Sequence, residues 1–131
     1  MNYINAKISD IKSRDSLNIV SFQAGEILLK MMSLELEENV QKDSSVILGV
    51  KSTNVALMKG SGEHLSISNQ LPCVISSLQM GELLCKVSLK GSGFELDSII
   101  TKDSALRLNL CLQDEVLALI KSNELSIAQV L

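Results

Sequence analysis

The stretch Leu65-Ser66-Ile67-Ser68-Asn69-Gln70-Leu71-Pro72 divides the sequence into two similar halves. It holds the only proline of the chain, and the pattern that follows it has a copy near the N-terminus. Ile8-Ser9 matches Ile75-Ser76, and Val20-Ser21 matches Val87-Ser88 at the same offset. Because further matches keep this order along the chain, the sequence predicts a tandem repeat of one small unit.

Each half has the pattern of strands and turns of a small all-β domain. Runs rich in Ile, Val and Leu, partly alternating with polar residues, predict half-buried strands at 4–11, 17–22, 27–32, 45–50 and 55–58 and at 73–78, 83–89, 94–100, 116–120 and 125–130. Ser33 and Thr101 occupy matching places as N-caps, so we expect one short helix in each half. Five short strands and one helix fit an OB-like barrel. We therefore expect an all-β chain of two tandem OB-like five-stranded barrels, with domains at 1–62 and 63–131.

Composition excludes several kinds of partner. The 131 residues carry a net charge of −3, from 12 basic and 15 acidic residues, whereas a nucleic-acid partner requires a basic face. The chain has one tyrosine, two phenylalanines and no tryptophan, so it lacks aromatic platforms for base stacking. It has no apolar run long enough to span a membrane, and residues 1–7 lack the apolar h-region expected of a signal peptide. We expect a cytoplasmic protein without nucleic-acid or membrane partners, and an OB-type nucleic-acid module is the weaker alternative.

Residues for catalysis or metal binding are few. His64 is the only histidine and lies beside the Gly60-Ser61-Gly62 turn, and no nucleophile elbow or phosphate-binding loop occurs. Cys73, Cys85 and Cys111 are far apart in the sequence, which predicts free thiols rather than disulfides or a zinc site. We expect neither an enzyme nor a side-chain metal centre.

Neutral hydrogen-bond donors and lysines instead gather at the ends of elements. Two serines precede a strand, a Lys-Ser pair follows the fourth strand of each half, and a hydroxyl begins each expected helix, where free N–H groups favour an anion. Hydroxyls and an ammonium suit a small tetrahedral oxyanion. The alternative is that these residues are plain caps, solvated turns and surface. The candidate set is Ser66, Ile67, Ser68, Thr101, Lys121 and Ser122, with Ser33, Lys51 and Ser52.

A family resemblance supports the oxyanion interpretation. Residues 65–71 resemble the L-S-A-R-N-Q-L opening of Mop domains, a subgroup of the TOBE family. Thr101-Lys102-Asp103-Ser104 and the run 118–123 resemble that domain's later V-T-K-E-S and A-L-I-K-A-S-N patterns. The similarity covers essentially the whole chain and is stronger in the second half. In one departure, Ser68 stands where the family has an arginine.

The resemblance implies a function and an assembly. It implies OB-like barrels that form a homo-oligomer, with a trimer favoured, and that bind molybdate or tungstate at subunit interfaces for storage or homeostasis. The residues that it places at the site are Ser66, Ser68, Thr101, Lys121 and Ser122, with Ser33, Lys51 and Ser52 as first-half counterparts. Because the arginine is replaced at Ser68, a ligand-poor regulatory or interaction domain remains the alternative.

Overall fold

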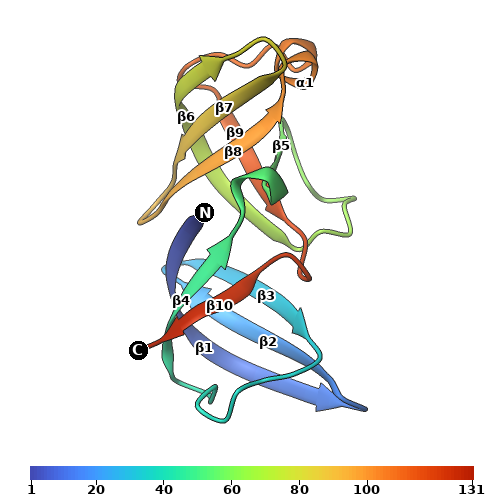
Figure 1. The fold of residues 1–131 in the computed structure, drawn as a ribbon, viewed down its shortest axis with the longest axis vertical. Helices are drawn as coiled ribbons and strands as arrows, with labels where there is room; N and C mark the ends of the chain where they lie inside the picture. The colour runs from blue at the N-terminus through green and yellow to red at the C-terminus, as the bar shows by residue number, and fades with distance from the viewer.

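The computed structural model describes all 131 residues and contains two antiparallel sheets, one above the other along the long axis (Figure 1). The elements, in chain order, are β1 (Asn2–Arg14), β2 (Leu17–Ala24), β3 (Ile27–Ser33), β4 (Ser45–Val50), the 3₁₀ turn η1 (Ser52–Asn54), β5 (Ala56–Met58), β6 (Asn69–Met80), β7 (Leu84–Lys90), β8 (Glu95–Thr101), α1 (Lys102–Arg107), β9 (Glu115–Ile120) and β10 (Ser126–Val130). The expected all-β class is confirmed.

The two halves exchange their last strands. The first sheet has the order β10-β4-β1-β2-β3, and the second has the order β5-β9-β6-β7-β8. Thus β10 pairs with β4 of the first half, and β5 pairs with β9 of the second half. The connector before each exchanged strand crosses the junction between the sheets, as the green and red segments do in Figure 1. Neither five-stranded sheet is complete without the other half.

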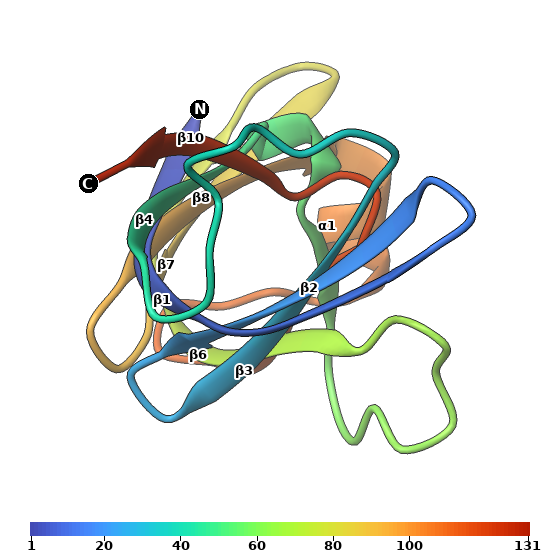
Figure 2. The ribbon, with the colours of Figure 1, turned by 90° about the horizontal axis from the view of Figure 1, so that it is seen from below.

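Turns and bulges give both sheets the same shape. Asp15 and Ser16, both with positive φ, form the tight turn between β1 and β2, a geometry that matches the twist of a hairpin. The register of β1 shifts between Ile8 and Asp10, and that of β6 shifts at the matching place. Because a bulge bends a strand, these long strands can pair with different neighbours along their length. Seen end-on in Figure 2, the strands curl around the long axis.

One hydrophobic core links the sheets. A single cluster of 23 buried residues contains side chains from both halves. Val55 and Leu125, each just before an exchanged strand, are 1% and 3% exposed and carry the core across the junction. The alternation that predicts the strands is visible in β7, where Cys85, Val87 and Leu89 are buried and the residues between them are more exposed.

The helix expected at the start of 33–44 is a wrong prediction, because only the second half has an α-helix. Ser33 does not cap: its Oγ donates to the backbone oxygen of Glu35 at 2.6 Å. The following segment makes two isolated turns, in which the N–H of Val40 donates to the oxygen of Glu37 and that of Ser44 to the oxygen of Gln41. By contrast, the Thr101 hydroxyl accepts from the N–H of Ser104, and α1 buries Ala105 against the sheet. The hydrogen-bonded order of each sheet is open at both edges, so no barrel is closed by a ladder.

Candidate functional site

The register of the second sheet brings two predicted site residues together. Asn69 pairs with Ile120 at one end of the β6–β9 ladder, so Ser68 and Lys121 are the next residues beyond this pair. Both are exposed, and neither the Ser68 hydroxyl nor the Lys121 ammonium makes a hydrogen bond or an ion pair. Ser66 is exposed and equally unengaged. This end of the sheet therefore presents two free hydroxyls beside a free cation.

The loop that carries the serines is held in shape by Gln70. Its side-chain Nε2 donates to the backbone oxygens of Gly62 and Ile67, each at 2.9 Å. A Cβ at residue 62 would overlap the Gln70 amide, so a larger residue there would push this side chain aside. Ile67 is half-buried between the exposed serines. The serine backbone is thus anchored at one point, with the hydroxyls left free.

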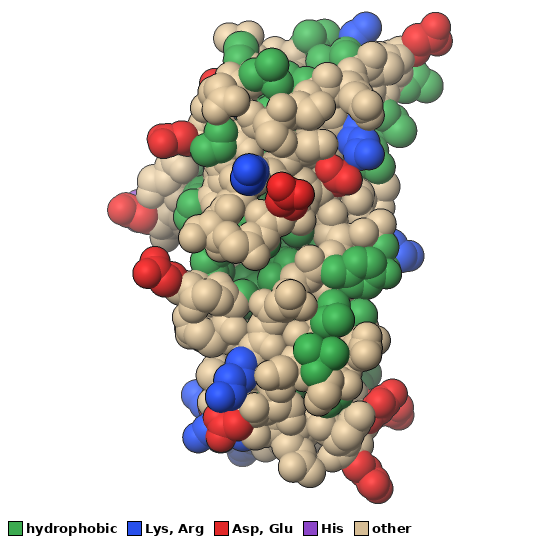
Figure 3. Space-filling view, turned by 90° about the vertical axis from the view of Figure 1, so that its left-hand side faces the viewer, with side chains coloured by type: hydrophobic (Ala, Val, Ile, Leu, Met, Phe, Trp, Pro, Cys, Tyr) green, Lys and Arg blue, Asp and Glu red, His purple; other side chains and the backbone are tan.

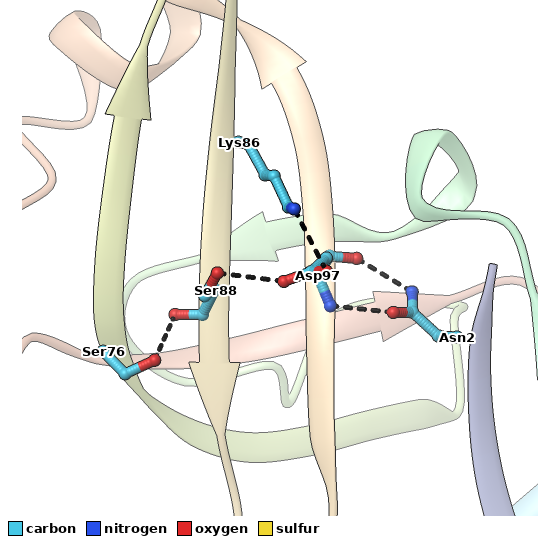
Figure 4. Close-up of polar contacts among 5 residues, drawn as sticks. All are labelled: Asn2, Ser76, Lys86, Ser88 and Asp97. Atoms are coloured by element: carbon cyan, nitrogen blue, oxygen red, sulfur yellow. Dashed lines mark hydrogen bonds and ion pairs between the residues drawn. The ribbon is translucent and has the colours of Figure 1, made fainter.

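Asn69 fastens this loop to the other half of the chain. Its fully buried side chain donates from Nδ2 to the oxygen of Lys30 at 2.8 Å, and Oδ1 accepts from the N–H of Lys30 at 2.7 Å. Such a pair of bonds imitates one more strand residue on the edge of β3. Asn2 makes the matching pair of bonds with Asp97 of β8, both at 2.8 Å (Figure 4). We call these two contacts the asparagine clamps.

Ser33 lines an acidic cavity near the turn that carries Ser122. The N–H of Met32 donates to the oxygen of Ser122 at 3.0 Å, so the end of β3 rests on the turn that follows β9. A cavity of about 410 Å³ opens here, and Ser33 lines it together with Glu35 and Glu37. No lysine or arginine lines this cavity. The two carboxylates disfavour an anion, which argues against an oxyanion next to Ser33.

Lys51 and Ser52 lie at the mirrored place, away from the serine loop. Asn2 pairs with Val50, so Lys51 lies beyond that pair, where the opposite residue is Met1 rather than a serine. The backbone of Lys51 and Ser52 is used in η1, whose Asn54 side chain donates to Glu124 across the junction at 2.8 Å. The first half therefore has a counterpart of Lys121 but none of the Ser66 and Ser68 hydroxyls.

Thr101 is not brought to the serine loop within one chain. It pairs with Leu84, next to the Met80–Cys85 end of the β6–β7 hairpin, whereas Ser68 precedes the other end of β6. In Figure 1 the adjoining α1 lies at the top of the molecule, far from the junction. The Thr101 hydroxyl also donates to Ser104 Oγ at 3.0 Å, so its principal role in one chain is the helix cap.

Two other lysines are engaged in ion pairs. Lys59 forms an ion pair with Asp114 at 3.1 Å, and the N–H of Cys111 with the Lys59 ammonium holds the pKa of Asp114 below its usual range. Lys86 forms an ion pair with Asp97 at 3.7 Å. On the face shown in Figure 3, acidic and basic side chains are interspersed and no basic stripe runs along the molecule. Two lysines without an ion pair remain beside the backbone of the serine loop: Lys121, just beyond the Asn69–Ile120 pair, and Lys30, whose backbone bonds to Asn69. Lys30 is not among the residues predicted from the sequence.

No group of three or more His, Cys, Asp or Glu side chains is placed to hold a metal ion. The three cysteines are free, and burial raises the pKa of the Cys73 and Cys85 thiols. None of the helices has the length and apolar character needed to cross a bilayer. A cavity of about 560 Å³ lies beside Pro72 and Lys90 and contains none of the predicted site residues.

Several known proteins are similar to this chain. Residues 65–127 match the TOBE domain family. A crystal structure of the cytoplasmic molybdate-binding protein ModG, with molybdate bound, superposes with a TM-score of 0.90 at 24% identity, covering 96% of this chain and 94% of that one. A molybdate-binding protein from Sporomusa ovata is 32% identical over 55% of this chain and all of that one, with a TM-score of 0.46.

A curated relative is much longer than this chain. General negative regulator of transcription subunit 1 from Schizosaccharomyces pombe is 26% identical over 99 residues, which are 76% of this chain and 5% of that protein. The superposition on ModG, by contrast, spans nearly the whole of both chains, so both halves and their exchanged strands form a fold already seen in a solved structure.

Proposed function

Since the chain is a TOBE-domain protein, we propose that it binds molybdate or tungstate and catalyses no reaction. The observation that carries this proposal is the meeting of Ser68 and Lys121 beyond the Asn69–Ile120 pair, with a free hydroxyl and a free ammonium. These tetrahedral dianions offer only acceptors, so donors and positive charge are what a site must supply. The near-complete superposition on a protein that binds molybdate supports the same ligand class.

Binding would rest on several modest contacts. The hydroxyls of Ser66, Ser68 and Ser122 would donate hydrogen bonds, with Ile67 between the two loop serines, and Lys121 would add a charged donor. A hydrogen bond to a charged group contributes roughly 1.5–3 kcal/mol. A few such contacts are enough for micromolar affinity once the costs of ordering are subtracted. The size of the ligand would separate molybdate and tungstate from the smaller sulfate and phosphate.

The site would be completed by a second copy of the chain. Thr101 lies at the end of the second sheet remote from Ser68, so one chain does not supply the whole predicted set. A closed homo-oligomer, with a trimer favoured, would bring the Thr101 end of one copy to the serine loop of another. In this proposal the protein stores or buffers the oxyanion in the cytoplasm. Lys51, Ser52 and Ser33 would be vestiges of a matching first-half site.

The proposal also covers the architecture. The curled strands of each sheet would form an OB-like barrel, and the duplicated units would be 1–62 and 63–131. Because the fifth strands are exchanged, each folded barrel would combine four strands of one unit with the last strand of the other.

Titration calorimetry with molybdate, tungstate, sulfate and phosphate tests the function. Lys121→Ala should weaken molybdate binding by about 1.5–3 kcal/mol, the loss expected for a charged hydrogen bond. Lys90→Ala is the matched control, because it removes the same charge from an exposed position at the end of β7 without a side-chain partner. Equal affinities of the two variants would place the anion elsewhere.

A second candidate function follows from one residue. Ser68 replaces a bidentate guanidinium with a single hydroxyl, which favours a ligand-poor regulatory or interaction domain. In that case the wild type should bind none of the four anions. The same titration of Ser68→Arg then tests the pocket, because an otherwise intact pocket should bind molybdate once the bidentate guanidinium is restored.

A further inference from the structure

The two asparagine clamps are built alike but differ in charge. Asn69 holds the backbone of Lys30, and Asn2 holds the backbone of Asp97. In both clamps the same two backbone groups of an edge strand are bonded, so the residue held by the clamp has the same place in each. That residue is a cation beside the serine loop and an anion at the other end. The repeat therefore has opposite charges at equivalent positions.

Lys30 is available to a ligand. It is exposed on β3 between the buried Leu29 and Met31, and its ammonium makes no ion pair or hydrogen bond. Because the clamp makes residues 30 and 69 neighbours, the Lys30 side chain begins one residue away from Ser68. Four flexible carbons give a lysine ammonium several ångströms of reach. Lys30, whose backbone bonds to Asn69, and Lys121, just beyond the Asn69–Ile120 pair, thus lie beside the Ser68 segment on two different sheets.

The Asn2 end has the opposite character. The Asp97 carboxylate accepts a hydrogen bond from the Ser88 hydroxyl at 2.9 Å and faces Lys86 at 3.7 Å (Figure 4). Glu95 and Asp97 both line the cavity there, and no lysine or arginine lines it. Met1 stands in the place that Ser68 has in the second half. The negative charge and the lack of a counterpart of Ser68 both disfavour an oxyanion at this end.

We propose that Lys30 supplies the second positive charge of the Ser66–Ser68 site, in place of the absent arginine, and that Asp97 makes the equivalent place beside Asn2 reject oxyanions. The inference rests on the proposed oxyanion binding and names the first-half residue that it requires. It makes the site a joint product of both halves, although the serines and Lys121 all belong to the second half.

Calorimetry with molybdate on the full chain tests the role of Lys30. Lys30→Gln should weaken binding roughly tenfold or more, the loss expected for one charged hydrogen bond. Lys86→Gln is the matched control: it removes the same charge from an exposed lysine at the Asn2 end and should change the affinity less than twofold. Lys30→Arg should retain binding. Equal affinities of Lys30→Gln and the wild type would overturn the inference while leaving the proposed function standing.

Nuclear magnetic resonance locates the anion. The side-chain amides of Asn69 and Asn2 are both buried, so each gives a local probe of one clamp. On titration with molybdate the Asn69 amide signals should shift and those of Asn2 should not. Shifts at Asn2 of equal size would overturn the assignment of Asp97. No binding by the wild type in calorimetry would overturn both this inference and the proposed function.

Discussion

Replacing Asn69 by alanine should remove a large part of the stability that fastens the two halves together. Asn69 is 0% exposed, and its amide makes two hydrogen bonds to Lys30, at 2.7 and 2.8 Å. A neutral hydrogen bond contributes about 0.5–1.5 kcal/mol, so the pair accounts for about 1–3 kcal/mol. The N–H and C=O of Lys30 would also lose their partners, which raises the cost, although water can reach an edge strand and recover part of it. We expect a loss of about 2 kcal/mol.

Urea unfolding followed by circular dichroism measures this loss, with protein concentration fixed because any assembly would contribute to the apparent stability. Asn2→Ala is the matched variant, since Asn2 is 6% exposed and makes the same two bonds at 2.8 Å. It should cost a similar amount. Asn123→Ala is the control: Asn123 is exposed and its side chain makes no hydrogen bond, so the free energy of unfolding should change by less than about 0.5 kcal/mol.

The result that refutes this reasoning is a cost below about 0.5 kcal/mol for Asn69→Ala, the size of an ordinary surface substitution. The clamp would then be a consequence of the packing between the sheets and would contribute nothing of its own. A large loss for Asn69→Ala with none for Asn2→Ala would show that the equivalence of the two clamps is geometric only.

Two further predictions concern assembly. Fragments 1–62 and 63–131 should not fold separately, because each would lack the strand that completes its sheet. Mixing the two fragments should restore the circular dichroism of the intact chain. A cooperative unfolding transition in either isolated fragment would contradict the prediction. The intact chain should sediment as a trimer at micromolar concentration, because the exposed Leu83 and Leu106 leave apolar surface near Thr101 that a second copy would cover. A stable monomer at sedimentation equilibrium would count against a site completed by a second copy.

The strands were predictable because local pattern decides them. Alternation of buried and exposed residues marks β7, and the Thr101 cap with Asp103 in the first turn marks α1. The same reasoning failed at Ser33. A serine hydroxyl can accept from a backbone N–H, which caps a helix, or donate to a backbone carbonyl, and the Ser33 hydroxyl donates to the carbonyl of Glu35. Leu36 and Val40 of this segment pack against the core but are only partly buried, whereas Ala105 of α1 is buried.

The sequence pattern did not predict that the two halves exchange their last strands. Ala56-Leu57-Met58 would present the same side chains whether β5 folded back on β4 or crossed to β9. The decision lies in the connector, where Val55 is buried and the buried Ser98 hydroxyl donates to its backbone oxygen. Because this contact joins residues far apart in the chain, no local pattern signals it. The same holds for the Asn69–Lys30 clamp, which is why Lys30 was not among the predicted site residues.

Exchange and site are physically coupled. Ser68 is positioned by Asn69, which is fastened to β3 of the first half, and the turn after Lys121 accepts a hydrogen bond from the end of that same strand through Ser122. The serine loop and the lysine turn are therefore both braced against β3, although both belong to the second half. A ligand that bridges Ser68 and Lys121 would bind the assembled junction better than a loosened one, and it would stabilise the folded chain by mass action. Ligand-induced stabilisation should then shrink in Asn69→Ala and persist in Asn2→Ala, because only the first of these clamps braces the proposed site.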